Sequence, residues 1–310
     1  MKDKVAILGE CMLELSQSSS VIEQMSKPML LSYGGDTLNT AVYLARLGIE
    51  VEYITALGDD SMSEWMINCW RSEGVGCASV ARYANSSPGL YMIETDDTGE
   101  RSFLYWRDNS PVRRLLDSDT KAQDLQNTLS NYQIFYLSGI SLALYDDSSR
   151  ARLFNVIKRY RSDGGSVIFD GNYRPRLWPD INLAKKAYER MYQLTDIALP
   201  TVEDEKMLFN DSNYEDIKSR LISCGVKEIV LKMGAEGCVV SNGAEDITVA
   251  TTPVKVIDST SAGDSFNAAY LAAKINGADY YHCASSGNAL AALVIQHRGA
   301  IIPKELMPDV

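Results

Sequence analysis

The sequence predicts an α/β fold in which a mainly parallel β-sheet is flanked by helices on both faces. Short apolar runs of strand length alternate with amphipathic runs of helix length along most of the chain. Polar residues end or follow several of the apolar runs, among them Glu10, Asp170 and Lys232. Because ligands of such sheets bind beyond the carboxyl ends of the strands, we expect these three residues near a binding site.

The alternation begins at the N-terminus. The apolar run at residues 5–8, closed by Gly9, indicates a buried strand. Residues 37–47 have a helical period, with Asp36 as the expected N-cap and Gly48 at the end. Further strands are expected at residues 51–57, 134–137, 167–169, 197–199 and 229–231, and further helices at 61–72, 148–160, 262–275 and 280–297.

Two stretches interrupt the alternation and predict a small β-sheet. Residues 13–31 are polar and mixed, and residues 90–106 alternate around Asp97-Thr98-Gly99, which is typical of a β-hairpin. We expect both at one edge of the main sheet, as a lid built from insertions at residues 12–33 and 88–110 of a single domain, residues 1–310. The alternative is an ordinary surface hairpin.

Composition and charge exclude several classes of function. The chain has 310 residues, 45% hydrophobic and 23% charged, as in ordinary soluble globular proteins. Its net charge of −11 counts against nucleic acid as a partner. An anionic substrate would therefore need a local cluster of Arg or Lys, because salt screens charges beyond about 8 Å.

The cysteine and histidine content favours a cytoplasmic protein without a zinc site. The six cysteines form no Cys-x-x-Cys pair, and the two histidines form no His-Glu-x-x-His motif. No apolar stretch approaches the roughly 18 residues of a membrane span. The apolar run near the N-terminus is also too short for a signal peptide. We expect no membrane partner.

The strongest local signal is the segment Asp258-Ser259-Thr260-Ser261-Ala262-Gly263-Asp264-Ser265-Phe266, at the start of an expected helix. Its small residues let a ligand approach the backbone, and the N–H groups of residues 261–264 would point at an anion. Asp264 stands where a carboxylate could accept a proton from a substrate hydroxyl. The alternative is an ordinary helix start, capped by Thr260 or Ser261.

A second signal is the pair Gly34-Gly35 followed by Asn39, at the start of another expected helix. The two glycines allow close approach to the backbone. The Asn39 amide offers a donor and an acceptor together, which suits a polyol or sugar. The alternative is simple turn chemistry.

Together the two motifs resemble those of the ribokinase or PfkB family of carbohydrate kinases. The first is similar to the family signature Asp-Thr-Thr-x-Ala-Gly-Asp-x-Phe, with Ser259 in place of the first Thr, and the second to Gly-Gly-x-x-x-Asn. The order and separation of the motifs also fit, and the likeness covers nearly the whole chain. It implies a ribokinase-like fold and transfer of a phosphoryl group from MgATP to a sugar.

A narrower resemblance is to the 2-keto-3-deoxygluconate kinases of that family. It implies phosphorylation of the C6 hydroxyl of 2-dehydro-3-deoxy-D-gluconate, a sugar acid. The segments that carry it are Gly9-Glu10-Cys11-Met12-Leu13-Glu14-Leu15, Gly34 to Thr40, Pro88-Gly89-Leu90-Tyr91, Gly99-Glu100-Arg101, Tyr105-Trp106-Arg107, Asn172-Tyr173-Arg174-Pro175-Arg176-Leu177-Trp178, and Ile295 to Pro303.

The resemblance implies a role for each motif residue. Asp264 would be the catalytic base, and the amides of residues 261–264 (Ser261, Ala262, Gly263 and Asp264) would hold the phosphoryl group. Arg107 and Arg174 would pair with the carboxylate that neutral sugars lack, the alternative being surface charges or structural ion pairs. The implied sugar-binding residues are Gly34, Gly35, Asn39, Tyr91, Tyr105, Arg107, Arg174 and Asp264.

Nucleotide and metal residues follow from the same resemblance. The implied nucleotide-binding residues are Asn172, Lys232, Gly234, Gly237 and Asn288, with Ser261, Ala262 and Gly263. Taken alone, the two glycines after Lys232 would indicate a hairpin turn, and the chain has no P-loop motif. Where the family often has Asn-x-x-Glu near Mg²⁺, this chain has Thr201 and Asp204. Asp204 is thus a candidate for the Mg²⁺ site, or only part of an acidic helix start. A monovalent cation requirement stays open.

Two rival functions remain at this point. A fructokinase or ribokinase type of sugar kinase would act on a neutral sugar and need neither arginine. A non-catalytic sugar-binding protein could keep the fold, although the intact segment around Asp264 argues against it. We also expect a homo-oligomer formed through the lid, because exposed β edges pair readily.

Overall fold

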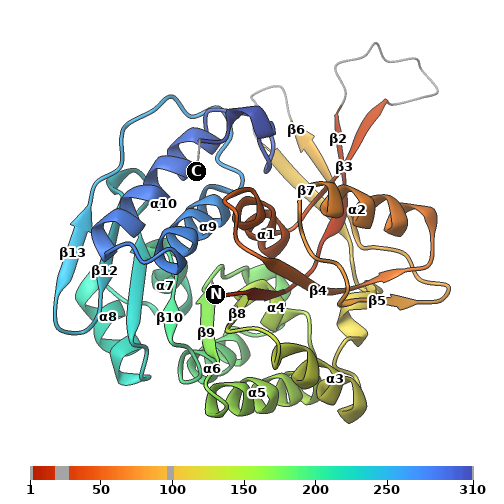
Figure 1. Cartoon of the computed structure of the whole chain (residues 1–310), viewed down its shortest axis with the longest axis horizontal. Coiled ribbons are helices and arrows are strands. Elements are labelled where there is room, and N and C mark those ends of the chain that lie inside the picture. The colour runs from red at the N-terminus through yellow and green to blue at the C-terminus, as the bar shows by residue number, and fades with distance from the viewer. Residues whose placement is uncertain (1–2, 18–27, 96–100, 309–310) are drawn as a thin grey trace.

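The protein, described here from a computed structural model, is seen at residues 3–17, 28–95 and 101–308 (Figure 1). In these residues a nine-stranded sheet contains seven neighbouring parallel strands. Two further strands at one edge pair antiparallel. Its order is β13 (Asp246–Val249), β12 (Cys238–Ser241), β11 (Glu228–Lys232), β10 (Ile197–Ala198), β9 (Ser166–Asp170), β8 (Ile134–Ser138), β1 (Val5–Leu8), β4 (Val51–Gly58) and β5 (Val80–Tyr83).

Helices cover both faces of this sheet, and the pleat of β1 shows why. Val5 and Ile7 face one hydrophobic core, whereas Ala6 and Leu8 face the other, and all four are fully buried. The first core is covered by α1 (Asp36–Arg46), α2 (Ser61–Ser72), α9 (Ala262–Ile275) and α10 (Tyr280–Val294). The second is covered by α3 (Asp119–Leu129), α4 (Gly139–Ala143), α5 (Asp147–Ser162), α6 (Ile181–Tyr192), α7 (Val202–Phe209) and α8 (Tyr214–Ser223).

A separate four-stranded sheet stands beside α2 (Figure 1). Its order is β3 (Met29–Gly34), β2 (Met12–Gln17), β6 (Leu90–Thr95) and β7 (Arg101–Trp106). The pairs β2–β3 and β6–β7 are antiparallel, and β2 and β6 are parallel neighbours. The predicted hairpin is confirmed, although its turn at Asp97-Thr98-Gly99 lies outside the described residues.

The caps of α1 and α9 differ from the prediction. Gly35, not Asp36, is the N-cap of α1, and Asp36 is the first helical residue. Ser261 occupies the N-cap of α9 in a left-handed conformation, but its side chain caps nothing, and the Thr260 hydroxyl donates to Asp258 instead. Among the described α-helices, every other one has a side-chain cap, such as Asp60 at α2. The free N–H groups of α1 and α9 are thus left for other acceptors.

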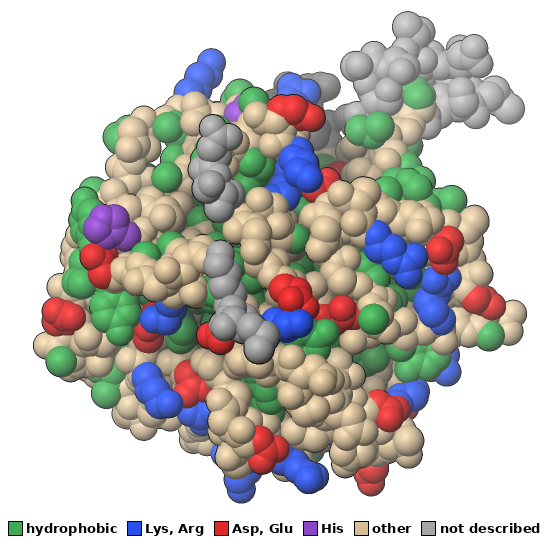
Figure 2. Space-filling view, viewed as in Figure 1, with side chains coloured by type: hydrophobic (Ala, Val, Ile, Leu, Met, Phe, Trp, Pro, Cys, Tyr) green, Lys and Arg blue, Asp and Glu red, His purple; other side chains and the backbone are tan. Residues whose placement is uncertain are grey.

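The surface and the helix lengths agree with the composition. Figure 2 shows acidic and basic side chains interspersed over one face, without a continuous basic band. In the described part of the chain, no helix combines the length and apolar character that crossing a bilayer requires.

Candidate active site

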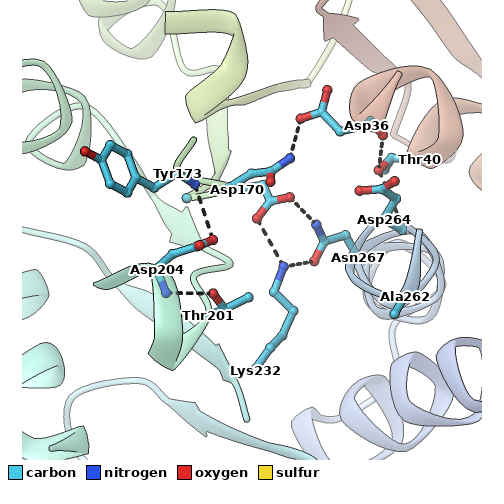
Figure 3. Close-up of polar contacts among 12 residues, drawn as sticks. Asp36, Thr40, Asp170, Tyr173, Thr201, Asp204, Lys232, Ala262, Asp264 and Asn267 are labelled. Carbon is cyan, nitrogen blue, oxygen red and sulfur yellow. Dashed lines mark hydrogen bonds and ion pairs between the residues drawn. The ribbon is translucent and has the colours of Figure 1, made fainter. Parts of the chain in front are cut away.

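The carboxyl ends of the parallel strands bring distant polar residues together. Asp170 ends β9 and Lys232 ends β11, and the Lys232 ammonium lies 3.1 Å from a carboxylate oxygen of Asp170 (Figure 3). Glu10, two residues beyond β1, is also buried. Asp170 and Lys232 therefore meet at the carboxyl ends of the strands, where a binding site is expected in a sheet of this kind.

Asp264 and Asn39 join the starts of α9 and α1. The Asn39 side-chain nitrogen donates to Asp264 Oδ2 at 2.8 Å. The Thr40 hydroxyl lies 3.2 Å from the Asp36 carbonyl and 3.3 Å from the Asp264 carbonyl, so it ties the two first turns together (Figure 3). The buried Asn39 Oδ1 has no partner among the described residues. The Asp264 carboxylate can therefore accept from one substrate hydroxyl and Asn39 Oδ1 from another.

Burial makes Asp264 more basic than an ordinary aspartate. The loss of solvent raises the pKa of Asp264 to about 7, and the neighbouring carboxylates of Asp36 and Asp170 add to the shift. The hydrogen bond from Asn39 acts in the opposite direction. A carboxylate with a pKa near neutrality is suited to taking a proton from a hydroxyl at physiological pH.

The start of α9 provides fewer free amides than the sequence predicts. The Ala262 amide donates to the Ser259 carbonyl at 3.3 Å. The amides of Ser261, Gly263 and Asp264 have no acceptor within the described part of the chain. These N–H groups and the helix dipole favour an anion beside Asp264.

The small sheet places Tyr91 against the glycine pair. A side chain at Gly34 would collide with the Tyr91 hydroxyl, and one at Gly35 would collide with the Glu10 carbonyl. The Tyr91 hydroxyl donates to Glu14. Tyr105 is 47% exposed and packs on Tyr91, with 6.1 Å between ring centroids. Two of the predicted sugar-binding residues, Gly34 and Tyr91, therefore meet within the small sheet.

Arg107 is buried and already paired. Its guanidinium forms an ion pair with Glu10, and the two side chains are 8% and 2% exposed. Arg107 Nε and Glu10 Oε1 both lack a partner among the described residues. The structural ion pair that the sequence left as an alternative is thus present, and it keeps one donor and one acceptor for a ligand.

Arg174 lies apart from Arg107, beside the candidate metal residue. Its guanidinium is 3.8 Å from Asp204, and its side chain is 54% exposed. Burial raises the pKa of Asp204, whereas Arg174 lowers it. Thr201, in place of the family's Asn, caps α7 by accepting from the Asp204 amide at 3.2 Å.

A Mg²⁺ ion would find one accessible carboxylate here. The described residues contain no group of three or more His, Cys, Asp or Glu side chains that could hold a metal. Within the described part of the chain, Asp204 accepts from the Tyr173 amide at 3.3 Å and lies 3.8 Å from the Arg174 guanidinium. This donor set fits Mg²⁺, which takes few carboxylates and completes its shell with water and phosphate oxygens.

The predicted nucleotide residues divide into two groups. Gly237 and Asn288 meet at the Val249 carbonyl, which would collide with a side chain at Gly237 and accepts from the Asn288 amide at 3.0 Å. Gly234, with φ +56°, is the first residue of the turn that joins Lys232 to Gly237. Asn172 lies elsewhere: its amide donates to Asp36 at 2.6 Å, toward the sugar side.

Sequence reasoning assigned no role to several residues of the site. Glu14 and Asp36 contact predicted residues directly. Asn267 contacts both Lys232 and Asp170. Its position three residues after Asp264, on the same helix face, is a signal that the sequence contains.

Known proteins resemble this chain over nearly its full length. The family model "pfkB family carbohydrate kinase" matches residues 2–307. The 2-dehydro-3-deoxygluconokinase of Escherichia coli (strain K12) is 44% identical, covering 99% of this chain and 100% of that protein. The protein of the same name from Dickeya dadantii (strain 3937) is 45% identical, covering 98% of each.

A solved structure from Escherichia coli that contains ATP and Mg²⁺ superposes with a TM-score of 0.83 at 25% identity, covering 96% of this chain and 94% of that chain. The expected ribokinase-like fold, a mainly parallel sheet between helices with a small second sheet, is confirmed. The rival of a non-catalytic binding protein loses its support, because full-length relatives are kinases. The chain therefore belongs to the pfkB family of carbohydrate kinases.

Proposed function

We propose that the protein transfers the γ-phosphoryl group of ATP to the C6 hydroxyl of 2-dehydro-3-deoxy-D-gluconate, giving 2-dehydro-3-deoxy-6-phosphogluconate. The observation that carries the proposal is the pair Asn39 and Asp264 beside the free amides of α9. The names of the relatives at 44% and 45% identity support the choice of substrate.

The acceptor hydroxyl binds at Asp264. The Asp264 carboxylate accepts the proton of this hydroxyl as the new bond to phosphorus forms, and Asn39 Oδ1 accepts from a second hydroxyl of the sugar. General-base catalysis of this kind contributes about 10²- to 10⁴-fold. The Asn39 amide nitrogen holds the carboxylate in place throughout.

The phosphoryl group lies over the first turn of α9. The N–H groups of Gly263 and Asp264 stabilise its charge, which is the larger part of catalysis in phosphoryl transfer. ATP supplies the group, and Asp204 would hold Mg²⁺, which would neutralise phosphate charge. Lys232, Gly234, Gly237 and Asn288 line the nucleotide side.

The carboxylate end of the substrate faces the small sheet. Arg107 Nε can donate to it while Glu10 keeps the guanidinium oriented. Tyr91 and Tyr105 close the site from β6 and β7, which makes the small sheet the lid. Arg174 joins from the main sheet if it leaves Asp204.

The lid is also the surface that we expect to join two copies. Its edge strands carry Leu30, 61% exposed, and Trp106, 55% exposed. Exposed apolar edge strands pair with other chains, so a homo-oligomer through the small sheet follows.

The neutral-sugar rival keeps one supporting observation. Arg107 is already neutralised by Glu10, so its charge is not free to attract an anion. The two functions differ in the acceptor that the enzyme prefers.

An ADP-release assay with MgATP decides between them. The acceptors are 2-dehydro-3-deoxygluconate, fructose, ribose and adenosine, with Asp264→Asn as the background control and KCl varied to test for a monovalent cation. We expect kcat/KM for the sugar acid to exceed the others by about 100-fold, since each charge-assisted hydrogen bond contributes about 1.5–3 kcal/mol. Preference for a neutral sugar would contradict the proposed substrate.

A further inference from the structure

The buried cluster of Asp170, Lys232 and Asn267 lies next to the catalytic helix. Asp170 and Lys232 end strands on either side of the two-residue strand β10, and Asn267 is in the second turn of α9. Their exposed fractions are 3%, 7% and 0%. A buried ionic cluster is costly to maintain, so its position at the site calls for a role.

Almost every polar atom of the cluster is engaged. Asp170 accepts from the Lys232 ammonium at 3.1 Å through one oxygen and from the Asn267 amide at 2.9 Å through the other (Figure 3). Asn267 accepts from Lys232 at 3.0 Å and also donates to the Tyr136 hydroxyl at 3.0 Å. The geometry of the ammonium is therefore set by two acceptors on two different elements.

One proton of the ammonium remains. A lysine side chain has three N–H donors, and two are used within the described part of the chain. The space in front of Gly263 shows where the third can act. A side chain built at Gly263 would have one neighbour within 4 Å, the Lys232 ammonium nitrogen at 3.5 Å. The ammonium thus faces the same open space as the free Gly263 amide.

We propose that Asp170 and Asn267 are positioning residues that hold the Lys232 ammonium over Gly263, so that its third proton binds the phosphoryl group during transfer. The inference rests on the phosphoryl transfer proposed above. It assigns Lys232 to the transferred group rather than to the nucleotide in general. Apart from its effect on the pKa of Asp264, Asp170 acts through Lys232.

Asp170→Asn tests the positioning role. Asparagine has one acceptor oxygen, so its NH₂ group would face either Lys232 or the Asn267 amide, both of which are donors. We expect kcat to fall about 10- to 100-fold while KM for the sugar acid changes less than about threefold, because the lost interaction is with the γ-phosphoryl group, strengthens in the transition state and does not involve the sugar. The assay is run near pH 8.5, above the pKa of about 7 for Asp264. Asp264 is then ionised in both the wild type and the variant, so the loss of the Asp170 charge does not change the fraction of ionised base.

A double-mutant cycle with Lys232→Met tells positioning from independent effects. Lys232→Met alone should lower kcat about 10²- to 10³-fold, as removal of a transition-state donor does. Asp170→Asn added to Lys232→Met should cost less than about threefold more, because Asp170 then has no ammonium to hold. The double variant also carries no unpaired buried charge, so it keeps the test informative if a single variant folds poorly. Losses that multiply would overturn the proposal.

Asp196→Asn is the matched control. Asp196 is also buried, at 8% exposure, and is paired with Arg161 at 2.9 Å. It lies just before β10, at the amino ends of the strands and away from the carboxyl ends where Asp170 and Lys232 lie. It should lower the melting temperature and leave kcat unchanged. A kcat for Asp170→Asn that equals that of Asp196→Asn would reduce the cluster to a structural role.

Calorimetry separates this proposal from the choice of sugar. Asp170→Asn should weaken binding of an imido analogue of ATP about tenfold and leave ADP binding unchanged, since only the analogue has a γ-phosphoryl group. This readout needs no acceptor, so it stands even if the acceptor panel rejects the sugar acid. Equal weakening of both nucleotides would overturn the role assigned to Lys232.

Discussion

Asn39 and Asp264 are 225 positions apart in the chain, and the amide of the first donates to the carboxylate of the second at 2.8 Å. This contact joins α1 and α9, the two described α-helices whose first turns have no side-chain cap. It brings the sugar-side amide, the base and the free backbone N–H groups to one point. The predictions below examine what this junction does.

Replacing Asp264 should stop turnover without abolishing substrate binding. Asp264→Asn removes the proton acceptor, and we expect kcat to fall about 10²- to 10⁴-fold. Binding of the sugar acid, measured by calorimetry, should change less than about tenfold, because the sugar keeps its contact with Asn39 Oδ1 and the amide oxygen of the variant can still accept from the hydroxyl. Near-normal turnover would mean that another group takes the proton.

The rate should depend on pH through the carboxylates around Asp264. Because the base acts when ionised, kcat/KM should rise with pH around the pKa of about 7 for Asp264. Asp36→Asn removes a negative charge that raises the pKa of Asp264, so the rise should move to lower pH. Asp170 contributes in the same direction, and the Asn39 hydrogen bond opposes both. An unmoved pH profile in Asp36→Asn, with Asp196→Asn as control, would argue against this coupling.

The pair of Arg107 and Glu10 should set affinity for the sugar acid. Arg107→Met alone would leave Glu10 buried and unpaired, which destabilises proteins by about 3–5 kcal/mol. The double variant Glu10→Gln with Arg107→Met avoids that charge. In it we expect KM for the sugar acid to rise about 10- to 100-fold and KM for ATP to stay constant. An unchanged KM for the sugar acid would leave the pair a purely structural role.

Glu205 should make the fold less stable as pH rises. It is buried in α7 beside Tyr192 and Arg220, and burial raises the pKa of Glu205 to about 7. At pH values between the ordinary pKa of a glutamate and about 7, the folded state holds a proton that the unfolded state has lost. The free energy of unfolding therefore falls as the pH rises through this range. Glu205→Gln should remove up to about 3 kcal/mol of this dependence.

Chemical denaturation at several pH values measures that slope. Glu189→Gln, at an exposed position of α6, is the control and should keep the wild-type slope. Arg220 retains Asp211 as a partner at 2.5 Å in the Glu205 variant, so no cation is left unpaired. Equal slopes in wild type and Glu205→Gln would contradict the assignment.

The exposed lid edge should determine the oligomeric state. Light scattering should give the wild-type chain a multiple of its 34.3 kDa mass. Trp106→Lys places a charge on edge strand β7 and should give the monomer mass. Met207→Lys, on a residue of α7 that is also 55% exposed, should leave the mass unchanged. A wild-type monomer would refute association through the lid.

Much of the fold follows from local sequence patterns. The strand at 5–8 and the helices at 61–72 and 262–275 have the predicted bounds. Two of the missed elements have weak signals. α7 is short and acidic, and β5 is a partly exposed edge strand, so neither shows the apolar period that marks a core element.

Local patterns predict the alternation of strands and helices, the motif around Asp264 and the glycine pair, because each depends on residues within a few positions of one another. Which side chains meet depends on the tertiary structure. It paired Arg107 with Glu10, Asn172 with Asp36 and Lys232 with Asp170. Such contacts depend on the path of the chain through the sheet and on the burial that strengthens the interaction between opposite charges. Neither can be read from local spacing in the sequence.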